Sequence, residues 1–352
     1  MSKQILIIVV ALTLITLTLA FSNERPVIGI LTTPASDIPS IYSPENYSYI
    51  PYSYVQSVEA AGARVIPIPY DASPENITFL LKQVNGVLFT GGGTALNSSD
   101  PKTGKIGPSN MTAVGEFIIS KVIEANDNGI YLPLMGTCQG FEILILAISK
   151  DYNILATNYN DFRVSTNVTL WPAAFKSGPW STMLPRIRNA SQNQPFFLYN
   201  HYNALTIERF NNSKNLTDFL EITGISKPVL TNGAPFVAST QAKKYPIWGH
   251  QFHPEKNAFM WNFAANASHT PDSILATQHI TNFFVNEARK NNNTFVSEEV
   301  LKTSLIWGWK PVKSLDLTFI FPKVNEHPDS YPNLFPSNLI YGHCVGAGCT
   351  YE

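Results

Sequence analysis

The sequence predicts an α/β fold with a mostly parallel central sheet and helices on both of its faces. Short apolar runs alternate with stretches of helical spacing in the first part of the chain, which is typical of parallel strands joined by crossover helices. Two glycine turns, GGG and GTCQG, directly follow apolar runs, as turns at the carboxyl ends of such strands do. With 352 residues, of which 44% are hydrophobic, the chain can bury a large core.

Strands and helices are expected to alternate through this first part. The strands are continuous apolar runs, as strands buried on both faces are, and lie at residues 26–31, 63–68 and 131–135, with a further one in 87–93, where the strand runs into the GGG turn. The helices lie in YSYVQSVEAAG, which ends at Gly62, and at residues 73–84 and 113–125. The helix at 73–84 opens with a capping serine, a first-turn proline and an early acid. Both glycine turns should therefore face one crevice at the carboxyl ends of the strands.

The second part of the chain is less regular. FVAST at 236–240 and YPIWGHQFHP at 245–254 are expected to pair as strands, and 274–290 is the clearest amphipathic helix. From Pro322 onward the chain is rich in proline and asparagine, with little periodicity. We therefore expect one domain over residues 23–321 and a C-terminal extension over residues 322–352.

The first 22 residues have the pattern of a signal peptide. Lys3 precedes an apolar stretch from Ile5 to Leu19, and small residues that suit cleavage follow at Ala20 and Ser22. The alternative is a membrane anchor, but the apolar stretch is short for a span and is interrupted by three threonines. The mature chain is expected to begin near Asn23, without a membrane anchor.

Asparagines in glycosylation sequons agree with a secretory route. Such acceptors must lie on the surface, and the sequence contains Asn46, Asn76, Asn97, Asn110, Asn167, Asn189, Asn211, Asn215, Asn266 and Asn292 in this context. An oxidising compartment also favours paired cysteines, and Cys344 and Cys349 are close enough to bridge each other through a glycine-containing loop. That pairing leaves Cys138 without a disulfide partner.

Charge and motif content exclude two classes of function. The net charge is −1, from 24 basic and 25 acidic residues, and the basic residues are scattered, so nucleic acid is not an expected partner. The sequence has neither HExxH nor paired CxxC motifs. We expect no metal and no cofactor.

The turn GTCQGFE is the strongest indication of a catalytic site. A strand that turns sharply into a helix exposes its turn residue above the sheet, and flanking glycines relieve the crowding. Gly136 and Gly140 flank Cys138 in this spacing, and a helix starting near Phe141 directs its N-terminus at the sulfur. This pattern predicts a nucleophilic cysteine. The alternative is an inert buried thiol in a tight turn.

A cysteine nucleophile needs a base, and His253 in GHQFHPEK is the best candidate. Pro254 stiffens the chain after it, and Glu255 stands two residues on, where a carboxylate can orient the imidazole. His250, three residues earlier on the same expected strand, should point to the opposite face and has no expected role.

The GGG turn at residues 91–93 can supply part of an oxyanion hole. An amide without a Cβ beside it, that of Gly92, can approach a substrate carbonyl, and the amide of Gln139 would be the second donor. The alternative is a loop that needs positive φ angles.

Six segments in the same order resemble gamma-glutamyl hydrolases, within the class I glutamine amidotransferase-like superfamily of cysteine hydrolases. They are RPVIGIL, SYVQSVEAAGARVIPI, NGVLFTGGG, GTCQGFE, KYPIWGHQFHPEK and FFVNEARKNN, and together they span most of the mature chain. The resemblance implies a flavodoxin-like three-layer fold. The chain departs from the family at Thr90, where proline is frequent, and beyond Pro322, where it outruns the expected end.

Carried over residue by residue, the resemblance implies Cys138 as nucleophile, His253 as general base and acid, and Glu255 as the orienting carboxylate. Residues implied at the substrate cleft are Tyr49, Gly91, Gly93, Glu142 and His201. The residues around His201 match poorly, and a polar surface histidine is the alternative there. The implied substrate is folate poly-gamma-glutamate, the implied location extracellular, lysosomal or vacuolar, and the implied assembly a homodimer.

Two other functions remain open on the sequence. The same chemistry could serve a glutamine-hydrolysing subunit that feeds ammonia to a synthase, although the export pattern and the lack of a fused synthase domain disfavour it. The fold could also belong to a secreted glycoprotein that only binds, although a retired site has no reason to retain Cys138, His253 and Glu255 together.

Overall fold

The computed structural model describes residues 23–36, 38, 41–314, 317–324, 331, 334 and 335. The expected signal peptide and the expected Cys344–Cys349 bridge lie outside the described residues. Within the described helices, none combines the length and the apolar character needed to cross a bilayer.

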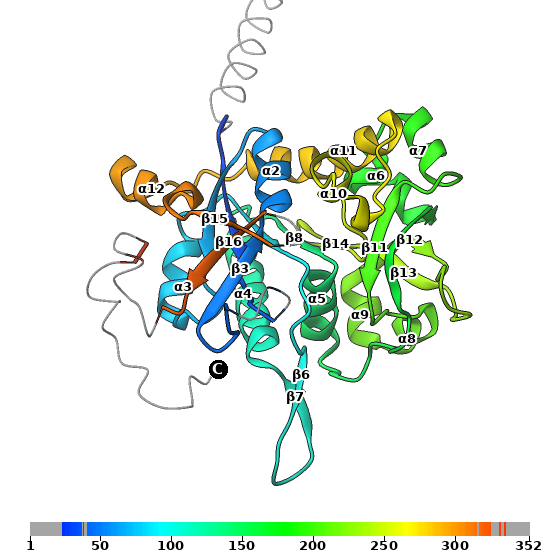
Figure 1. Ribbon diagram of the computed structural model, residues 1–352, viewed down its shortest axis with the longest axis horizontal. Coiled ribbons are helices and arrows are strands. Elements are labelled where there is room, and N and C mark those ends of the chain that lie inside the picture. The colour runs from blue at the N-terminus through cyan, green and yellow to red at the C-terminus, as the bar shows by residue number, and fades with distance from the viewer. Residues whose placement is uncertain are drawn as a thin grey trace, which may run out of the picture.

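An eight-stranded sheet forms the centre of the described chain (Figure 1). Its order is β10 (Thr169–Leu170), β12 (Leu220–Ser226), β13 (Phe236–Ala242), β14 (Ile247–His250), β8 (Leu134–Thr137), β5 (Gly86–Phe89), β1 (Val27–Leu31) and β4 (Arg64–Ile68). The five strands from β14 to β4 are mutually parallel, and β13 joins them antiparallel to β14. Along the chain these five follow the order 2-1-3-4-5, the order of flavodoxin-like folds. The predicted mostly parallel α/β sheet is confirmed.

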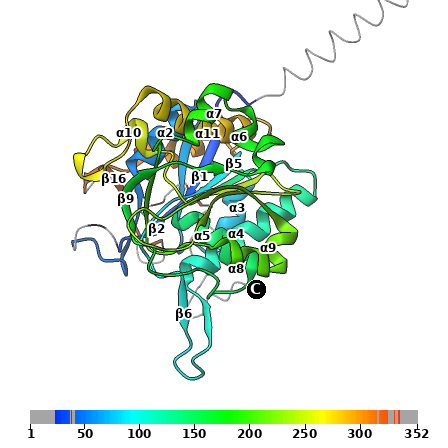
Figure 2. The same ribbon diagram turned by 90° about the vertical axis from the view of Figure 1, so that its right-hand side faces the viewer.

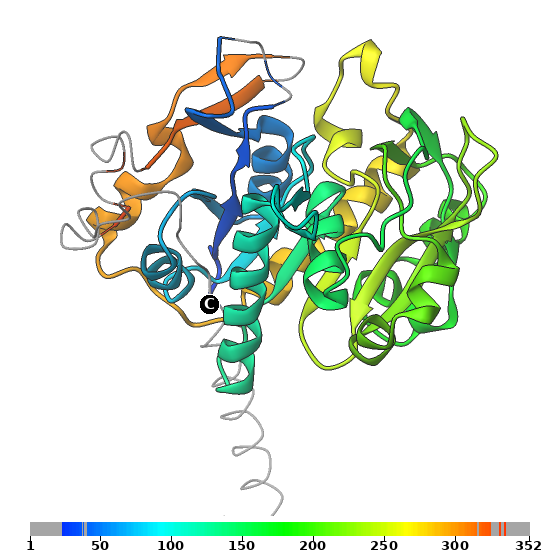
Figure 3. The ribbon, with the colours of Figure 1, turned by 90° about the horizontal axis from the view of Figure 1, so that it is seen from below.

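Helices cover both faces of this sheet, as Figures 1 and 2 show. One face carries α2 (Tyr52–Ala60), α6 (Gly178–Thr182), α7 (Pro185–Ser191), α10 (Lys256–Phe259) and α11 (Pro271–Ala288), with α11 contacting the other four. The other face, turned to the viewer in Figure 3, carries α3 (Pro74–Leu81), α4 (Asn110–Asp127), α5 (Gln139–Ser149), α8 (Ile207–Asn212) and α9 (Lys214–Phe219). The result is the three-layer arrangement that the resemblance implied.

Smaller elements extend the domain. A four-stranded sheet has the order β15 (Pro311–Lys313), β16 (Leu317–Pro322), β3 (Tyr47–Pro51) and β2 (Thr33–Pro34), and two pairs are β9 (Asp161–Thr166) with β11 (Phe197–His201) and β6 (Asn97–Ser99) with β7 (Ile106–Pro108). The remaining helices are α12 (Glu298–Ser304) and the 3₁₀ turns Pro172–Phe175, Phe263–Ala265 and Ile306–Gly308. The β6–β7 hairpin projects from the body of the molecule (Figure 1).

Most sequence-based boundaries hold to within a few residues, and the exceptions have local causes. Ser73 and Ser109 accept N-cap bonds from Asn76 and Thr112, so α3 begins where expected and α4 begins three residues before the expected Ala113. The strand β8 begins at Leu134, not at residue 131, because the Leu132 carbonyl bonds instead to the Asn126 side chain.

The start of the C-terminal extension packs onto the domain. The strand β16 ends at Pro322 and pairs with β3, so this late segment lies against the N-terminal part of the chain. Beyond it, Val324, Tyr331, Leu334 and Phe335 are buried and belong to the hydrophobic core. These residues of the extension therefore contribute to the core.

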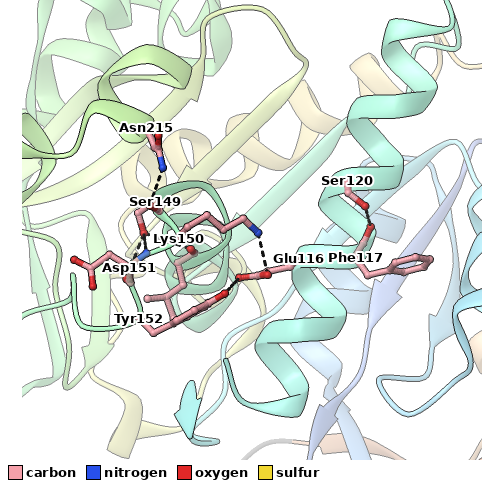
Figure 4. A network of polar contacts seen from close by, with 9 residues as sticks. Glu116, Phe117, Ser120, Ser149, Lys150, Asp151, Tyr152 and Asn215 are labelled. Carbon is pink, nitrogen blue, oxygen red and sulfur yellow. Dashed lines mark hydrogen bonds and ion pairs between the residues drawn. The ribbon is translucent and has the colours of Figure 1, made fainter. Parts of the chain in front are cut away.

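Polar contacts fix the C-terminal end of α5, the helix that follows the cysteine turn (Figure 4). Glu116 on α4 accepts bonds from Lys150 Nζ at 3.0 Å and from the Tyr152 hydroxyl at 2.8 Å. From α9, Asn215 donates to the Ser149 carbonyl at 3.0 Å. Because α5 is held at this end by two neighbouring helices, its N-terminus is held in place at the cysteine turn.

An aromatic cluster supports the segment that carries His253. The rings of Phe197 on β11 and Phe252 lie 4.5 Å apart, and Trp180 packs edge-on against Phe197 at 5.6 Å. The amide of His253 also donates to the Leu198 carbonyl at 2.9 Å. The histidine segment is therefore fixed to β11 by both side-chain packing and the backbone.

Most of the glycosylation sequons have accessible acceptors. Asn76 is the exception, since it is buried in the first turn of α3, and Asn167 is half-buried. The other acceptors are exposed: Asn46, Asn97, Asn110, Asn189, Asn211, Asn215, Asn266 and Asn292. The requirement that acceptors lie on the surface therefore fails for Asn76.

Candidate active site

Cys138 occupies a strained turn between β8 and α5. Its φ is 54° and its ψ is −112°, in a region that costs a residue other than glycine about 1–3 kcal/mol. The flanking glycines permit the turn, because a Cβ on Gly136 would lie 2.6 Å from the Gly140 carbonyl oxygen and a Cβ on Gly140 would overlap the Phe89 backbone. The predicted GxCxG geometry is thus required by the close approach of α5 to β5 and β8.

The Cys138 thiol lines a cavity of about 160 Å³, although the residue is only 3% exposed. Its sulfur lies 3.6 Å from the Asn200 carbonyl oxygen, to which the thiol donates. Burial raises the pKa of this thiol well above its usual range, and the charges of Glu142 and Glu255 raise it further. The resting side chain is therefore a neutral thiol that faces an accessible cavity.

His253 lines the same cavity and is held by one of its two ring nitrogens. Nδ1 lies 2.8 Å from Glu255 Oε1, and Nε2 has no hydrogen-bond partner among the described residues. A Cβ built on Gly91 would lie 2.9 Å from His253 Cε1 and 3.2 Å from Cys138 Cβ, so the two side chains meet at this glycine. With Nδ1–H directed at the carboxylate, Nε2 is the nitrogen able to accept a proton.

Glu255 is buried and stays ionised. Burial alone would raise the pKa of its carboxyl, but His253, through charge and hydrogen bond, and the Lys256 ammonium outweigh burial and lower it. Lys256 Nζ lies 3.8 Å from Glu255 Oε1 and donates to Ser53 Oγ at 3.0 Å. A fixed negative charge behind His253 favours the protonated imidazole that proton transfer from a thiol creates.

Backbone amides near the sulfur are available to an incoming oxygen. The Gly91 N–H is already taken, because it donates to the Tyr54 hydroxyl at 2.7 Å. The next amide, that of Gly92, borders the cavity and has no acceptor among the described residues. The Gln139 N–H is directed at the Cys138 sulfur from the first turn of α5. These are the two amides that the sequence singled out.

The five residues implied at the substrate cleft fall into two groups. Tyr49 and Gly91 line the cavity, whereas Gly93, Glu142 and His201 do not border it. Glu142 is buried one turn into α5, where it accepts bonds from Gln251 and Asn203 at 3.1 and 3.5 Å. Burial raises the pKa of Glu142 to about 7, against the opposing effect of these amides.

The two other histidines near the site are buried. The surface alternative for His201 is wrong, since the residue is 4% exposed and its Nδ1 lies 2.7 Å from the Asn203 carbonyl oxygen. Burial lowers the pKa of His201 to about 4 and that of His250 to about 3. Because β14 ends at His250, the strand-alternation argument for this residue was wrong, although His250 does stay out of the cavity.

Sequence reasoning missed several side chains that complete the site. The Tyr54 hydroxyl lies 3.3 Å from His253 Nδ1, and burial raises its pKa well above the usual range. Lys256, Asn200 and Arg163 also line the cavity. Lys256 directly follows the HPE motif and could have been noticed, whereas Tyr54, Asn200 and Arg163 reach the site only through the fold.

No group of three or more histidine, cysteine, aspartate or glutamate side chains in the described part of the chain is arranged to hold a metal ion.

Comparisons with known proteins find relatives that align with most of this chain. The family model described as Peptidase C26 matches residues 26–151. Gamma-glutamyl hydrolase B of Dictyostelium discoideum is 34% identical over 298 residues, which cover 85% of this chain and 82% of that protein. A gamma-glutamyl hydrolase of Glycine max is 34% identical over 307 residues, which cover 85% of each protein.

A solved structure, PurLQS from Thermotoga maritima, matches with a TM-score of 0.42 and 13% identity over 74% of this chain and 99% of that chain.

Proposed function

Because this chain belongs to the gamma-glutamyl hydrolase family of cysteine peptidases, we propose that it hydrolyses gamma-glutamyl bonds with Cys138 as nucleophile. The substrate class that we propose is folate poly-gamma-glutamate. One observation carries the proposal: the Cys138 thiol and a histidine with one ring nitrogen fixed and the other unpartnered line the same cavity.

Acylation begins from the neutral thiol. The thiol turns from the Asn200 carbonyl, His253 Nε2 accepts its proton, and the sulfur attacks the carbonyl carbon of the gamma-amide. The Gly92 and Gln139 amides donate to the oxyanion that forms. The imidazolium then protonates the leaving nitrogen, the C–N bond breaks, and an amine departs from a thioester on Cys138.

Deacylation reverses the roles of the same groups. A water molecule gives one proton to His253 Nε2, and its oxygen attacks the thioester carbon. The C–S bond breaks, the sulfur regains the proton from the imidazolium, and the product leaves as a free gamma-carboxyl group. Glu255 remains ionised through both steps and stabilises the imidazolium each time.

Cys138→Ala tests this function. We expect wild-type protein to release glutamate from a defined folate poly-gamma-glutamate, with products resolved by mass, and Cys138→Ala to release none. Matching thermal unfolding curves of the two proteins would show that the variant is folded. A folded Cys138→Ala protein with wild-type activity would refute the proposal.

Two further substrates in the same assay separate the alternatives. Ammonia release from free glutamine in place of gamma-linked cleavage would support a glutamine-hydrolysing subunit. No turnover of any gamma-glutamyl substrate, together with no reaction of Cys138 with a thiol-directed reagent, would support a glycoprotein that only binds.

The setting that we propose is the secretory route, ending outside the cell or in a lysosome or vacuole. Residues 1–22 are the proposed signal peptide, 23–321 the catalytic domain and 322–352 an extension. The exposed sequon asparagines support this route. A homodimer is the proposed assembly, and the molar mass of the secreted protein in solution tests it.

A further inference from the structure

We propose that Arg163 binds a carboxylate of the gamma-glutamyl substrate and sets the preference for chains with free α-carboxylates. This inference rests on the proposed function and adds the residue that reads the substrate's charge.

Arg163 stands at a β-bulge and lines the same cavity as Cys138. In the pairing of β9 with β11, Val164 faces Tyr199 and Phe162 faces Asn200, so Arg163 has no partner residue on β11. Its φ is 57°, in the left-handed region that residues other than glycine and asparagine rarely adopt. A bulge changes the direction of its side chain, and bulges are frequent beside active sites.

Neighbouring contacts hold the bulge in this form. Asn266 Nδ2 donates to the Arg163 carbonyl at 3.2 Å, and Ser165 Oγ donates to the Asn266 carbonyl at 3.0 Å. Two residues before the bulge, the fully buried Asp161 accepts the amides of Val229 and Leu230, each at 2.9 Å through Oδ1. A strained conformation that its surroundings fix in this way points to a function for the residue.

Arg163 is an exposed residue that lines the cavity, and its guanidinium is not neutralised by a described residue. Arg163 lines the cavity together with Cys138 and Asn200. The Asn200 carbonyl accepts the hydrogen bond from the Cys138 thiol. No hydrogen bond or ion pair joins its guanidinium to any residue that the structure describes. The other cation lining the cavity, Lys256, is close to Glu255 and bonds to Ser53. Among the described residues that line the cavity, Arg163 is thus the exposed cation.

A gamma-linked glutamyl chain presents the complementary charge. Each residue in it keeps a free α-carboxylate, so one lies on either side of the scissile amide. A guanidinium binds such a carboxylate through two parallel N–H···O bonds, which neither a lysine nor a neutral amide reproduces.

Carboxamide analogues of the substrate test this role. The substrate is an N-acylated gamma-linked diglutamate with both α-carboxylates free, and each analogue has one of the two converted to a carboxamide. Arg163→Gln removes the positive charge. Arg163→Lys keeps the charge but lacks the two parallel N–H donors of a guanidinium. Arg163→Asn also removes the charge, and asparagine tolerates a positive φ. Lys102→Gln, at the exposed end of the β6–β7 hairpin, is the control for a lost positive charge.

We expect Arg163→Gln and Arg163→Asn to raise KM on the free-acid substrate about tenfold or more, with kcat changed less than about threefold. One of the two carboxamide analogues should raise the wild-type KM by a similar factor and leave the KM of Arg163→Gln and Arg163→Asn unchanged. The α-carboxylate that this analogue lacks is then the one that Arg163 binds. Arg163→Lys should lie between wild type and Arg163→Gln, and Lys102→Gln should match wild type. The inference would be overturned if the Arg163 variants kept the wild-type KM on the free-acid substrate. In that case each carboxamide would also raise their KM as much as it raises that of wild type.

The failure of the inference and of the proposed function are separate outcomes. If Cys138→Ala abolishes cleavage while the Arg163 variants behave as wild type, only the role of Arg163 is refuted. If the wild-type protein cleaves no gamma-linked substrate, Cys138→Ala with and without Arg163→Gln is titrated with the intact diglutamate by calorimetry. Equal affinities, or no binding to either protein, refute the role of Arg163 as well.

Discussion

The two ends of the central sheet bury polar side chains in opposite ways. At the amino end, Asn85 Oδ1 accepts from the Val27 amide at 2.8 Å, and Asn85 Nδ2 donates to the carbonyls of Asn291 and Asn293 at 3.1 and 2.9 Å. At the carboxyl end, His253 Nε2 and Glu255 Oε2 are buried without a partner in the described part of the chain.

The difference separates groups that stabilise the fold from groups that we propose to serve a substrate. Both polar atoms of the Asn85 side chain, Oδ1 and Nδ2, have hydrogen-bond partners in the protein. The polar groups at the amino end of the sheet therefore stabilise the fold. At the other end Cys138 sits at a φ of 54° and the histidine keeps one nitrogen unpaired. Strain and unpaired atoms cost stability, and they are expected where a site is kept ready for a ligand.

His253→Gln should produce the largest effect, and on activity alone. Without a base the buried neutral thiol keeps its proton, so we expect kcat/KM on the gamma-linked substrate to fall about 10³-fold or more. Glutamine can still bond to Glu255, so the free energy of unfolding should change by less than about 1 kcal/mol. Initial rates and urea unfolding curves measure the two quantities.

The matched control is His279→Gln, on α11, where the imidazole bonds to the Pro179 carbonyl at 3.0 Å and does not border the cavity. It should keep wild-type rates. A His253→Gln protein that lost stability but kept its rate would break the contrast between the two ends of the sheet.

Asn85→Ala should produce the converse result. The substitution leaves the buried Val27 amide and Asn291 carbonyl, and the half-buried Asn293 carbonyl, without this partner, so we expect the free energy of unfolding to fall by about 2–4 kcal/mol. At a temperature where the variant is folded, kcat and KM should equal the wild-type values.

Asn128→Ala is the comparison for Asn85, because the side chain of this exposed asparagine donates to the Glu124 carbonyl in the turn after α4. It should cost less than about 1 kcal/mol. If Asn85→Ala reduced kcat while leaving the unfolding curve unchanged, the amino end would have a functional role that its hydrogen bonds do not suggest.

The features that the sequence could predict are those with a local pattern, and the features it could not predict depend on contacts between distant segments. The parallel strands and the elbow at Cys138 were predictable because apolar runs, caps and GxCxG spacing are local patterns. His253 and Glu255 were predictable because they share one short motif. The remaining site residues come from distant segments: the Tyr54 hydroxyl meets His253 only because α2 lies against the carboxyl end of the sheet.

The bulge at Arg163 shows the limit most clearly. No glycine or asparagine stands at this position to indicate a positive φ, and the register shift that creates the bulge depends on pairing with β11 some thirty residues later along the chain. The Asn85 network was missed for the same reason, since its partners Asn291 and Asn293 follow α11 near the end of the domain. Long-range pairing of backbone groups leaves no local pattern.

Glu142→Gln should have the smallest effect, and one that depends on pH. Burial raises the pKa of Glu142 from its ordinary value of 4.5 to about 7, so the folded state holds this proton more tightly than the unfolded state. The stability contributed by the protonated carboxyl is therefore complete below pH 4.5 and is lost as the pH rises to 7. At about 1.4 kcal/mol for each pH unit between the two pKa values, wild type loses up to about 3 kcal/mol.

Glutamine removes this titration, so Glu142→Gln should match wild type at pH 4.5 and exceed its stability by about 1–3 kcal/mol at pH 8, measured by urea unfolding. Gln251 can turn its amide to suit the new side chain, because its Oε1 has no partner among the described residues. Glu124→Gln, an exposed member of a surface ion pair with Lys121, should show no such dependence. Equal stabilities of Glu142→Gln and wild type at both pH values would mean that Glu142 is as well accommodated as Asn85. The buried and unpaired polar groups at the carboxyl end of the sheet would then reduce the free energy of unfolding less than we expect.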